Sequence, residues 1–180
     1  MNQIKSLNLV IRQFNTDDLD AIHAYASDSE VTKYMLFGPN TIDETRAFLD
    51  HVINHEYKAI PQRSFEYAIE YNHHLIGAVS IHFNETFEEA EIGWVINPLY
   101  QRQGFAYEAA STLINWAAEH YPLKKVIAHC DDRNISSYKL MEKLGMHLEC
   151  IHKDVKIVKK DGVHLREERL YSMNITKKGN

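Results

Sequence analysis

Two polar segments of the sequence contain the residue types that ligand binding and acid–base chemistry need. The first, Gln101 to Ala106, is a loop between an apolar strand and a helix. The first N–H groups of a helix have no partner inside it and lie at the positive end of its dipole, so they bind anions such as phosphates. Gly104 lets the backbone approach such a group closely. The loop therefore predicts a site for a ligand that carries phosphate.

This loop lacks the glycines of the common nucleotide-binding motifs. A Walker loop needs Gly-Lys-Ser/Thr, and a dinucleotide fingerprint needs three glycines, whereas Gly104 is the one glycine here. An ordinary strand-to-helix turn therefore remains the alternative for this stretch taken alone.

The second polar segment begins at Asn134, at the start of a helix that ends before Gly145. Asn134 and Ser136 can form an ordinary helix cap. Gly145 suits the left-handed C′ position that commonly follows a helix. A ligand contact by Asn134 is compatible with capping, so the segment can serve both purposes.

Both segments resemble the GNAT N-acetyltransferase superfamily. The first is similar to the acyl-CoA loop Gln/Arg-x-x-Gly-x-Gly/Ala, at Gln101, Gly104 and Ala106. The second is similar to Asn-x-x-Ser followed by Glu-Lys-Leu-Gly-Phe, with Met146 in place of the aromatic residue. The flanking Glu91-Ile92-Gly93-Trp94 and Tyr107-Glu108-Ala109 resemble the branch of the ribosomal-protein N-terminal acetyltransferases (RimJ/RimL-like).

The resemblance implies acetyl-CoA as co-substrate and no metal. By this resemblance the backbone of Trp94 and Ile96 holds the pantetheine and the acetyl oxygen, Asn134 binds the pantetheine arm, and the loop N–H groups hold the pyrophosphate. The implied cofactor-binding residues are Trp94, Ile96, Gln101, Arg102, Gln103, Gly104, Phe105, Ala106 and Asn134.

The resemblance also implies direct attack of an amine on the acetyl group, with no covalent enzyme intermediate. Many GNAT enzymes use a tyrosine at the position of Met141 to protonate the leaving thiolate, and methionine has no proton to give. In the ribosomal-protein branch the serine of Asn-x-x-Ser takes this role, which here is Ser137. Ser137 lies one turn from Met141 on the same helix face, and Tyr138 is the reserve candidate.

A general base is needed because a protonated amine cannot attack a thioester. Glu91 is the first candidate, on a strand face that it shares with Gly93 and Val95. Glu85, in the preceding loop, is the second candidate. Either carboxylate can instead be a solvated surface charge, and deprotonation through water needs no dedicated residue.

The acceptor is a primary amine, of a protein N-terminus or a small molecule, and the sequence does not choose between them. Glu85, Glu88, Glu89 and Glu91 crowd the loop and strand that lead to the expected reaction centre. Such a cluster favours a cationic acceptor, and a solvated acidic loop is the alternative. A non-catalytic acyl-CoA-binding sensor or scaffold with the same fold is the alternative function.

Length, charge and hydropathy limit the class of protein. At 180 residues the chain is expected to form a single domain over 1–180. It has no apolar run of about 18 residues that could span a membrane, and its start lacks the apolar segment of a signal peptide, so we expect a cytoplasmic protein. The net charge is −5 without a basic stripe, which argues against a nucleic-acid partner. The sequence leaves a monomer and a homodimer open.

Cysteine and histidine patterns indicate neither a disulfide nor a metal site. Cys130 and Cys150 belong to no Cys-x-x-Cys pair, and we expect them to be reduced and partly buried. His51 and His55 lie one helical turn apart with no third ligand indicated, so we expect a surface pair.

Apolar periodicity, caps and turns predict the order of elements. The GNAT fold has the same order, so the resemblance implies an α/β (α+β) fold in which helices flank a mixed, mostly antiparallel sheet. The expected strands are 7–14, 65–71, 75–83, 90–96, 125–129, 146–158 and 165–173. The expected helices are 17–27, a short turn at 31–37, 42–57, 106–120 and 136–144, and residues 175–180 are expected to fray.

Overall fold

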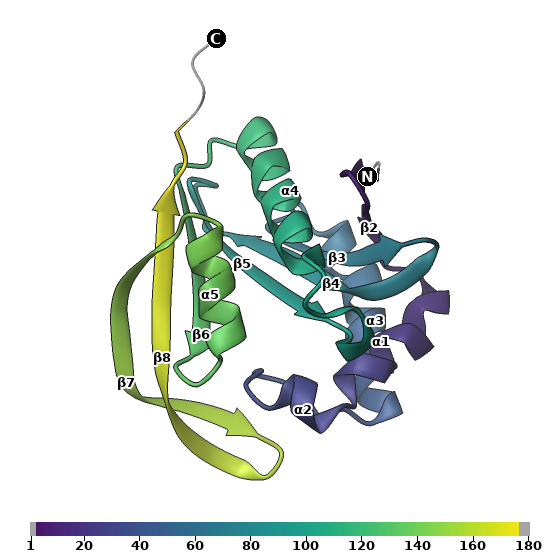
Figure 1. Ribbon diagram of the computed structural model, residues 1–180. Helices are drawn as coiled ribbons and strands as arrows, with labels where there is room; N and C mark the ends of the chain where they lie inside the picture. Colours follow the sequence, from purple (N-terminus) through teal and green to yellow (C-terminus); the bar gives the residue numbers. More distant parts are fainter. Residues whose placement is uncertain (1–2, 177–180) are drawn as a thin grey trace.

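Apolar residues recur at alternate positions along the middle of the chain, and these segments pair into one sheet (Figure 1). The structure, a computed structural model, describes residues 3–176, and within them the sheet has eight strands in the order β1-β2-β3-β4-β5-β6-β8-β7. Neighbouring strands are antiparallel except β5 and β6, which are parallel. The bounds are β1 Ile4–Lys5, β2 Val10–Gln13, β3 Ser64–Tyr71, β4 His74–Phe83, β5 Glu89–Ile96, β6 Lys125–Asp131, β7 His147–Lys159 and β8 Gly162–Asn174.

Helices cover both faces of this sheet (Figure 1). The helices are α1 Leu19–Ala26, α2 Ser29–Thr32, α3 Ile42–Asn54, α4 Phe105–His120 and α5 Ile135–Lys143. Three short 3₁₀ turns within the described residues are η1 Thr16–Asp18, η2 Glu56–Lys58 and η3 Pro98–Tyr100. The mixed, mostly antiparallel sheet flanked by helices confirms the predicted fold class.

Each face of the sheet has its own apolar core. On one face, α4 buries Ala110, Leu113 and Ala117 completely, and the two alanines let the helix lie close to the strands. On the other face, α1 and α3 bury Ile22 and Val52 against the sheet. Burial of one such aliphatic side chain stabilises the fold by about 1.5–3 kcal/mol, so both helical layers are firmly attached.

The sheet opens at its centre. β5 and β6 pair over Glu89–Glu91 and Lys125–Ile127. Beyond these residues β5 continues to Ile96 with no strand partner on that edge within residues 3–176. Figure 1 shows β5 and β6 diverging, with α2 and the tip of the β7–β8 hairpin beyond the wide end of the gap. Backbone groups on the facing edges are therefore free to bind something other than a strand.

Several predicted boundaries are confirmed by local hydrogen bonds. The helix predicted from residue 42 starts with a capping box, in which the Glu44 N–H donates to Thr41 Oγ1 at 3.3 Å and the Thr41 N–H donates to the Glu44 carboxylate at 2.7 Å. This helix was expected to reach residue 57 but ends at Asn54, and η2 follows it. The turn at Asn72 and His73, both with positive φ, joins β3 to β4 as predicted.

The N-terminal part differs from the prediction. The strand expected over 7–14 starts at Val10, because Ser6 and Asn8 donate hydrogen bonds to the Glu108 carboxylate and hold the preceding segment as a turn. The turn of helix expected at 31–37 is α2, four residues long, because Asp28 accepts a hydrogen bond from the Glu30 N–H and begins it earlier.

At the C-terminus, Ile175 was expected to fray. It instead donates a backbone hydrogen bond to the Lys124 carbonyl and packs against the core. The expectation for residues 177–180 lies outside the described residues.

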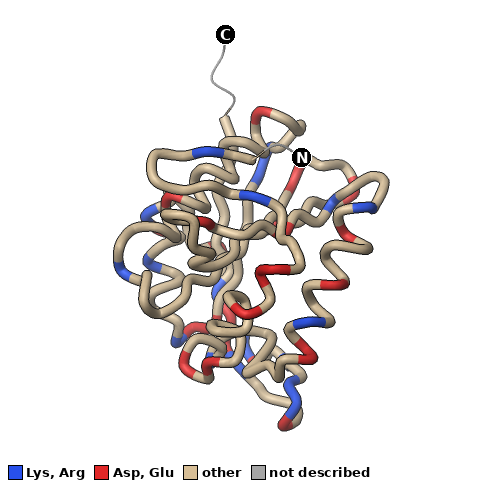
Figure 2. The backbone as a smooth tube through the Cα atoms, turned by 90° about the vertical axis from the view of Figure 1, so that its right-hand side faces the viewer, with Lys and Arg blue, Asp and Glu red and all other residues tan. Residues whose placement is uncertain are grey.

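Three bulk expectations can be compared with the structure. Cys130 is buried, Cys150 is half-buried, and both are free thiols, as expected. Within residues 3–176, none of the helices combines the length and the apolar composition that crossing a membrane would take. Figure 2 shows Lys and Arg interspersed with Asp and Glu along the chain.

Among the described glycines, Gly77 is the one at which an added Cβ would come closest to another atom, and this yields a stability prediction. A Cβ on Gly77 would lie 2.2 Å from the Val95 carbonyl oxygen and 3.0 Å from Ile96 Cα. We expect Gly77→Ala to lower the free energy of unfolding by about 1–3 kcal/mol, because the β5 backbone must shift. Gly93→Ala is the matched control, since its Cβ meets the rotatable Ser80 Oγ at 3.0 Å. Urea denaturation measures both variants, and equal losses would contradict the prediction.

Candidate active site

A cavity of about 1340 Å³ occupies the opening between β5 and β6. On one side of the sheet its walls are the 101–106 loop, the start of α4 and one face of α5. On the other side its walls are α1, α2, the segment after α2 and polar side chains of the sheet. The cavity therefore connects the two faces of the sheet through the gap.

The 101–106 loop has the geometry of an anion site. Arg102 and Gly104 have positive φ values of 62° and 88°, which turns successive N–H groups in one direction. Within residues 3–176 no acceptor pairs with the backbone N–H groups from Arg102 to Tyr107. The Gln101 side chain donates to the Ile96 carbonyl at 2.9 Å and ties the loop to the end of β5. A phosphate at this helix start would find several free donors.

Most of the predicted cofactor-binding residues lie on the wall of this cavity. They are Trp94, Ile96, Gln101, Arg102, Gly104, Phe105, Ala106 and Asn134. Gln103 is not among the lining residues, because its side chain turns away and donates to the Leu99 carbonyl at 3.3 Å.

Tyr107 and Lys143 are wall residues near the loop that the sequence analysis did not propose as ligand contacts. The Lys143 ammonium lies 4.6 Å from the centre of the Tyr107 ring, which positions a cation beside the loop. Lys143 follows Ser136 and Leu140 at helical spacing, and all three line the cavity. The period of α5 could therefore have identified this lysine.

The start of α5 brings one of the two candidate proton donors to the cavity. The Asn134 side-chain oxygen accepts from the Ser137 N–H at 3.2 Å and from the Ser136 hydroxyl at 2.9 Å, so Asn134 caps the helix. Ser137 lines the cavity, and its hydroxyl is hydrogen-bonded to the Cys130 thiol. Burial raises the pKa of Cys130 to about 11, which keeps this thiol neutral.

Tyr138, the reserve candidate, faces another environment. Its ring packs against the core and lies under the Arg169 guanidinium, 4.4 Å from the ring centre. Tyr138 is not among the residues that line the cavity. Of the two hydroxyls, the Ser137 hydroxyl is the one on the cavity wall.

On the face of the sheet away from α4 and α5, the cavity is lined by ionisable side chains whose charges alternate in sign. We call these side chains the charged row. Its members are Glu66 on β3, His82 on β4, Glu91 on β5, His129 on β6, and Glu168 and Arg166 on β8.

Hydrogen bonds or ion pairs join the charged row in three pairs. His82 Nε2 lies 3.2 Å from Glu66 Oε1, and His129 Nδ1 lies 2.9 Å from Glu91 Oε1. Arg166 and Glu168 form an ion pair. The sheet register places His82 directly opposite Glu91, so the row runs across neighbouring strands.

These contacts shift the ionisation of the row. The hydrogen bond from His129 lowers the pKa of Glu91, and the same bond raises the pKa of His129. The hydrogen bond to Glu66 likewise raises the pKa of His82. Each opposite charge thus favours the ionised form of its neighbour.

The structure separates the carboxylates that the sequence groups together. Glu91 lines the cavity and shares its sheet face with Gly93 and Val95, as predicted. Glu88 instead pairs with Lys124 at 2.5 Å, Glu89 lies 3.9 Å from Lys125, and neither lines the cavity. Glu85 is exposed and also outside the cavity wall. The acidic loop therefore lies outside the cavity wall, where two of its carboxylates pair with Lys124 and Lys125.

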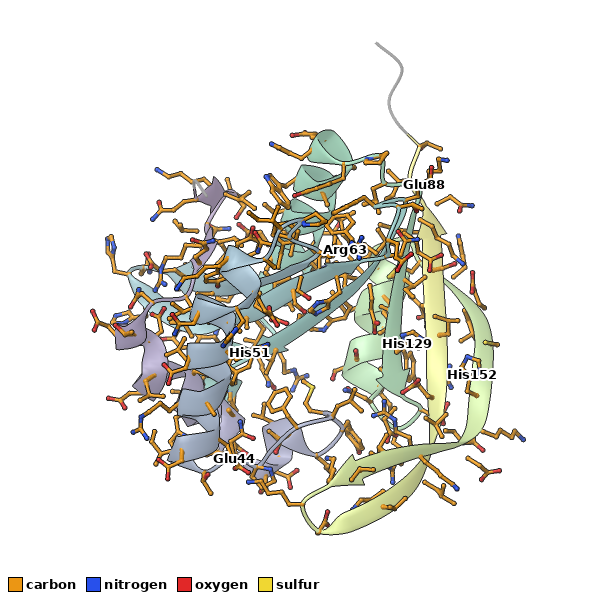
Figure 3. All side chains as sticks on the ribbon, turned by 180° about the vertical axis from the view of Figure 1, so that it is seen from behind. Glu44, His51, Arg63, Glu88, His129 and His152 are labelled. Atoms are coloured by element: carbon orange, nitrogen blue, oxygen red, sulfur yellow. The ribbon has the colours of Figure 1, made fainter. Side chains whose placement is uncertain are left out.

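His129 is one of several ionisable residues on the cavity wall that the sequence analysis did not propose. Figure 3 shows His129 on β6, at the side where β6 and β5 separate, whereas His152 lies on the outer strand β7. His51 on α3 and His55, which follows the end of α3, stack with ring centres 5.2 Å apart and do not line this cavity. Within residues 3–176 no group of three His, Cys, Asp or Glu side chains is arranged to hold a metal ion.

Comparison with known proteins assigns this arrangement to a family. The profile of the acetyltransferase (GNAT) domain matches residues 8–147. The uncharacterized N-acetyltransferase YnaD of Bacillus subtilis is 34% identical over 146 residues, which cover 81% of this chain and 83% of YnaD. A GNAT-family acetyltransferase structure from Bacillus anthracis is 31% identical with a TM-score of 0.81, over 96% of this chain and 98% of that chain.

Structures of lower identity share the fold. The acetyltransferase of Salmonella typhimurium that modifies the N-terminal serine of ribosomal protein L7/L12 has a TM-score of 0.84 at 17% identity, over 97% of this chain and 100% of that chain. The spermidine N-acetyltransferase of Vibrio cholerae, solved with CoA and spermine, has a TM-score of 0.77 at 20% identity, over 94% of this chain and 96% of that chain. With the profile match and the identity to YnaD, these findings establish that the chain belongs to the GNAT family of N-acetyltransferases.

Proposed function

We propose that this N-acetyltransferase moves the acetyl group of acetyl-CoA to a primary amine that enters from the α1–α2 side of the cavity. The observation that carries the proposal is the cavity itself, which joins the free N–H groups of the 101–106 loop to the charged row through the gap between β5 and β6. A cofactor with phosphates fits the first end, and an amine fits the second.

The residues at the loop end fit the cofactor. A Cβ built on Gly104 meets nothing within 4 Å, so the loop backbone borders open space at this point. The N–H groups of the loop and the first turn of α4 would hold the pyrophosphate. Lys143 adds a positive charge on the same wall, and Asn134 and the open edge of β5 at Trp94 and Ile96 would hold the pantetheine arm.

The remaining chemistry comes from groups on both sides of the gap. Acetyl-CoA supplies an activated thioester carbonyl for the amine to attack. Backbone N–H groups on the open edge of β5 would stabilise negative charge on the carbonyl oxygen. Ser137 would give a proton to the leaving sulfur, while a base on the charged row takes a proton from the ammonium; the sequence-based candidate for this base is Glu91.

The acceptor is inferred to be cationic before it reacts. The carboxylates Glu66, Glu91 and Glu168 on the sheet and Glu30 on α2 line the end of the cavity that faces α1 and α2. A protonated amine there would gain attraction that a neutral ligand would not. The Vibrio cholerae structure holds the polyamine spermine, and the Salmonella enzyme modifies a protein N-terminus, so both kinds of amine are candidates.

We also infer the RimJ/RimL-like branch and a single domain. The branch inference rests on Ser137 in the Asn-x-x-Ser motif and on its position on the cavity wall. One continuous sheet through the described residues supports a single domain for the chain.

Thiol release measures the activity. With acetyl-CoA and a panel of primary amines (spermidine, a peptide with a free N-terminal serine, an amino sugar), we expect free thiol to appear with at least one acceptor and not with its N-acetylated form. The KM of that acceptor should rise with salt, because exposed charges are screened over about 10 Å at 0.1 M. Acetyl-CoA binding without thiol release for any amine would instead support a sensor.

Gly104 tests the cofactor end. We expect Gly104→Val to abolish acetyl-CoA binding, measured by calorimetry, because the side chain would fill the space at the loop. Gly145→Val is the matched control: its φ is also +88°, its Cβ also meets nothing within 4 Å, and it lies outside the cavity wall. Both variants carry the same backbone strain, so an equal loss of acetyl-CoA affinity in both would refute the loop assignment.

Ser137 tests the proton donor. Ser137→Ala should lower kcat by about 10²-fold or more through loss of acid catalysis, with little change in acetyl-CoA affinity. Tyr138→Phe is the matched control, since it also removes one hydroxyl from the first turns of α5. If Tyr138→Phe lowers kcat and Ser137→Ala does not, the roles are the reverse.

A further inference from the structure

The two histidines of the charged row differ in how their ring nitrogens are used. In His82 both nitrogens have partners, Ser64 Oγ at 3.0 Å from Nδ1 and Glu66 Oε1 at 3.2 Å from Nε2. In His129, Nδ1 lies 2.9 Å from Glu91 Oε1, and Nε2 has no hydrogen-bond partner within residues 3–176. His129 lines the cavity, and its side chain is 27% exposed. One imidazole nitrogen is thus held, and the other is available to a ligand.

The contact with Glu91 fixes the tautomer of His129. An ionised carboxylate can accept hydrogen bonds and has none to donate. Nδ1 therefore carries the proton in this contact, and in the neutral ring the lone pair is on Nε2. A carboxylate behind an imidazole in this way orients the ring and stabilises the imidazolium that forms when the ring accepts a proton.

We propose that His129, positioned by Glu91, is the base that takes a proton from the acceptor ammonium. The inference rests on the proposed function and replaces Glu91 as the base by its bonded neighbour. The ammonium N–H bond breaks as its proton moves to Nε2, and the freed nitrogen lone pair forms the bond to the acetyl carbon. The carbon–sulfur bond breaks as the sulfur takes the Ser137 proton, and the second proton lost by the nitrogen restores the Ser137 hydroxyl. One proton ends on the sulfur and one is released from the imidazolium to water, so charge and atoms balance.

Glu91 is less suited to be the base because of what surrounds it. Its Oε1 is occupied by His129, and that hydrogen bond lowers the pKa of the carboxyl. His82, directly opposite in the register, lowers the pKa further. A carboxylate with a lowered pKa is a poor acceptor for the proton of an ammonium group. The pKa of His129 is raised, which brings it closer to the pKa of the amine.

The other charges around His129 come from every side of the cavity. On β8, Glu168 raises and Arg166 lowers the pKa of His129, after the larger effect of Glu91 on β5. Across the cavity, the ionisable groups of α1, α2 and the following segment are Tyr25, Glu30 and Tyr34, and Glu44 on α3 and Lys159 and Lys160 at the tip of the β7–β8 hairpin also line the wall. The net environment favours the imidazolium, as the reaction requires of the group that receives the proton.

Two substitutions separate the base from the residue that positions it. His129→Asn keeps an N–H near the position of Nδ1 for Glu91 but has no basic nitrogen, so we expect kcat to fall by about 10²–10⁴-fold with acetyl-CoA affinity unchanged. Glu91→Gln keeps a hydrogen-bond acceptor but no charge, so the imidazolium is less stable. The acidic limb of the kcat–pH profile should then move to lower pH, with a smaller loss of kcat at the plateau.

A matched control and an independent readout complete the test. His164→Asn removes an exposed histidine that also pairs with a carboxylate, Asp161 at 2.7 Å, outside the cavity wall, and should leave kcat unchanged. The ring titration of His129, followed by NMR, should move to lower pH in Glu91→Gln, and this measurement needs no turnover.

The outcomes distinguish the two proposals. If Glu91→Gln abolishes turnover while His129→Asn retains it, Glu91 is the base and the inference is wrong. Full activity in both variants, with an unchanged acidic limb, would also overturn it and favour deprotonation through water. If no amine supports turnover by the wild-type protein, the proposed function fails first, and a His129 titration that Glu91→Gln leaves unmoved would refute the pairing on its own.

Discussion

The parallel contact between β5 and β6 ends after Glu91 and Ile127, and the arrangement of the site depends on this limit. On its other edge β5 is bound to β4 along its length, from Ala90 to Ile96. β6 is likewise bound to β8 along its whole length. Each strand must follow its own half of the sheet, so the natural twist of the two halves separates them beyond the short shared segment. The cost is a row of backbone groups without strand partners, which a bound ligand can satisfy.

The two faces of the sheet use this opening differently. Toward α4 and α5 the cavity offers hydrogen-bond donors, namely backbone N–H groups, the amide of Asn134 and the hydroxyl of Ser137, together with the positive charge of Lys143. Toward α1 and α2 it offers charges that are already paired with one another. Isolated charges are expensive to bury, and the alternation along the charged row offsets that cost. The row can therefore line a partly enclosed cavity and still present carboxylate oxygens to a cation.

Local patterns in the sequence predicted those parts of the site that depend on one segment. The period of two placed Glu91 on the face of Gly93 and Val95, and the helix-start pattern placed Asn134 as the cap of α5 with Ser137 behind it. What a single segment does not contain is the register between distant strands. The pairing of Glu91 with Ile127 sets the register between β5 and β6. This register brings the His129 side chain beside the Glu91 carboxylate. Glu88 shows the opposite error. It lies near Glu91 in the sequence, but its carboxylate pairs with Lys124 and does not line the cavity.

The two proposed proton-transfer groups lie on opposite sides of β6, with His129 on β6 itself and Ser137 on the neighbouring helix α5. Successive residues of a strand point to opposite faces, so His129 faces the charged row, while its neighbour Cys130 faces α5 and is hydrogen-bonded to Ser137. In acyl transfer the attacking nitrogen and the leaving sulfur are different substituents of the same carbon, and each needs its own proton partner. With His129 on one face of the sheet and Ser137 on the other, the base can act on the nitrogen and the donor on the sulfur without either group moving. The neutral Cys130 thiol, kept protonated by burial, adds no charge near Ser137. In this proposal the separation of acid from base follows from strand geometry, because successive residues of β6 point to opposite faces.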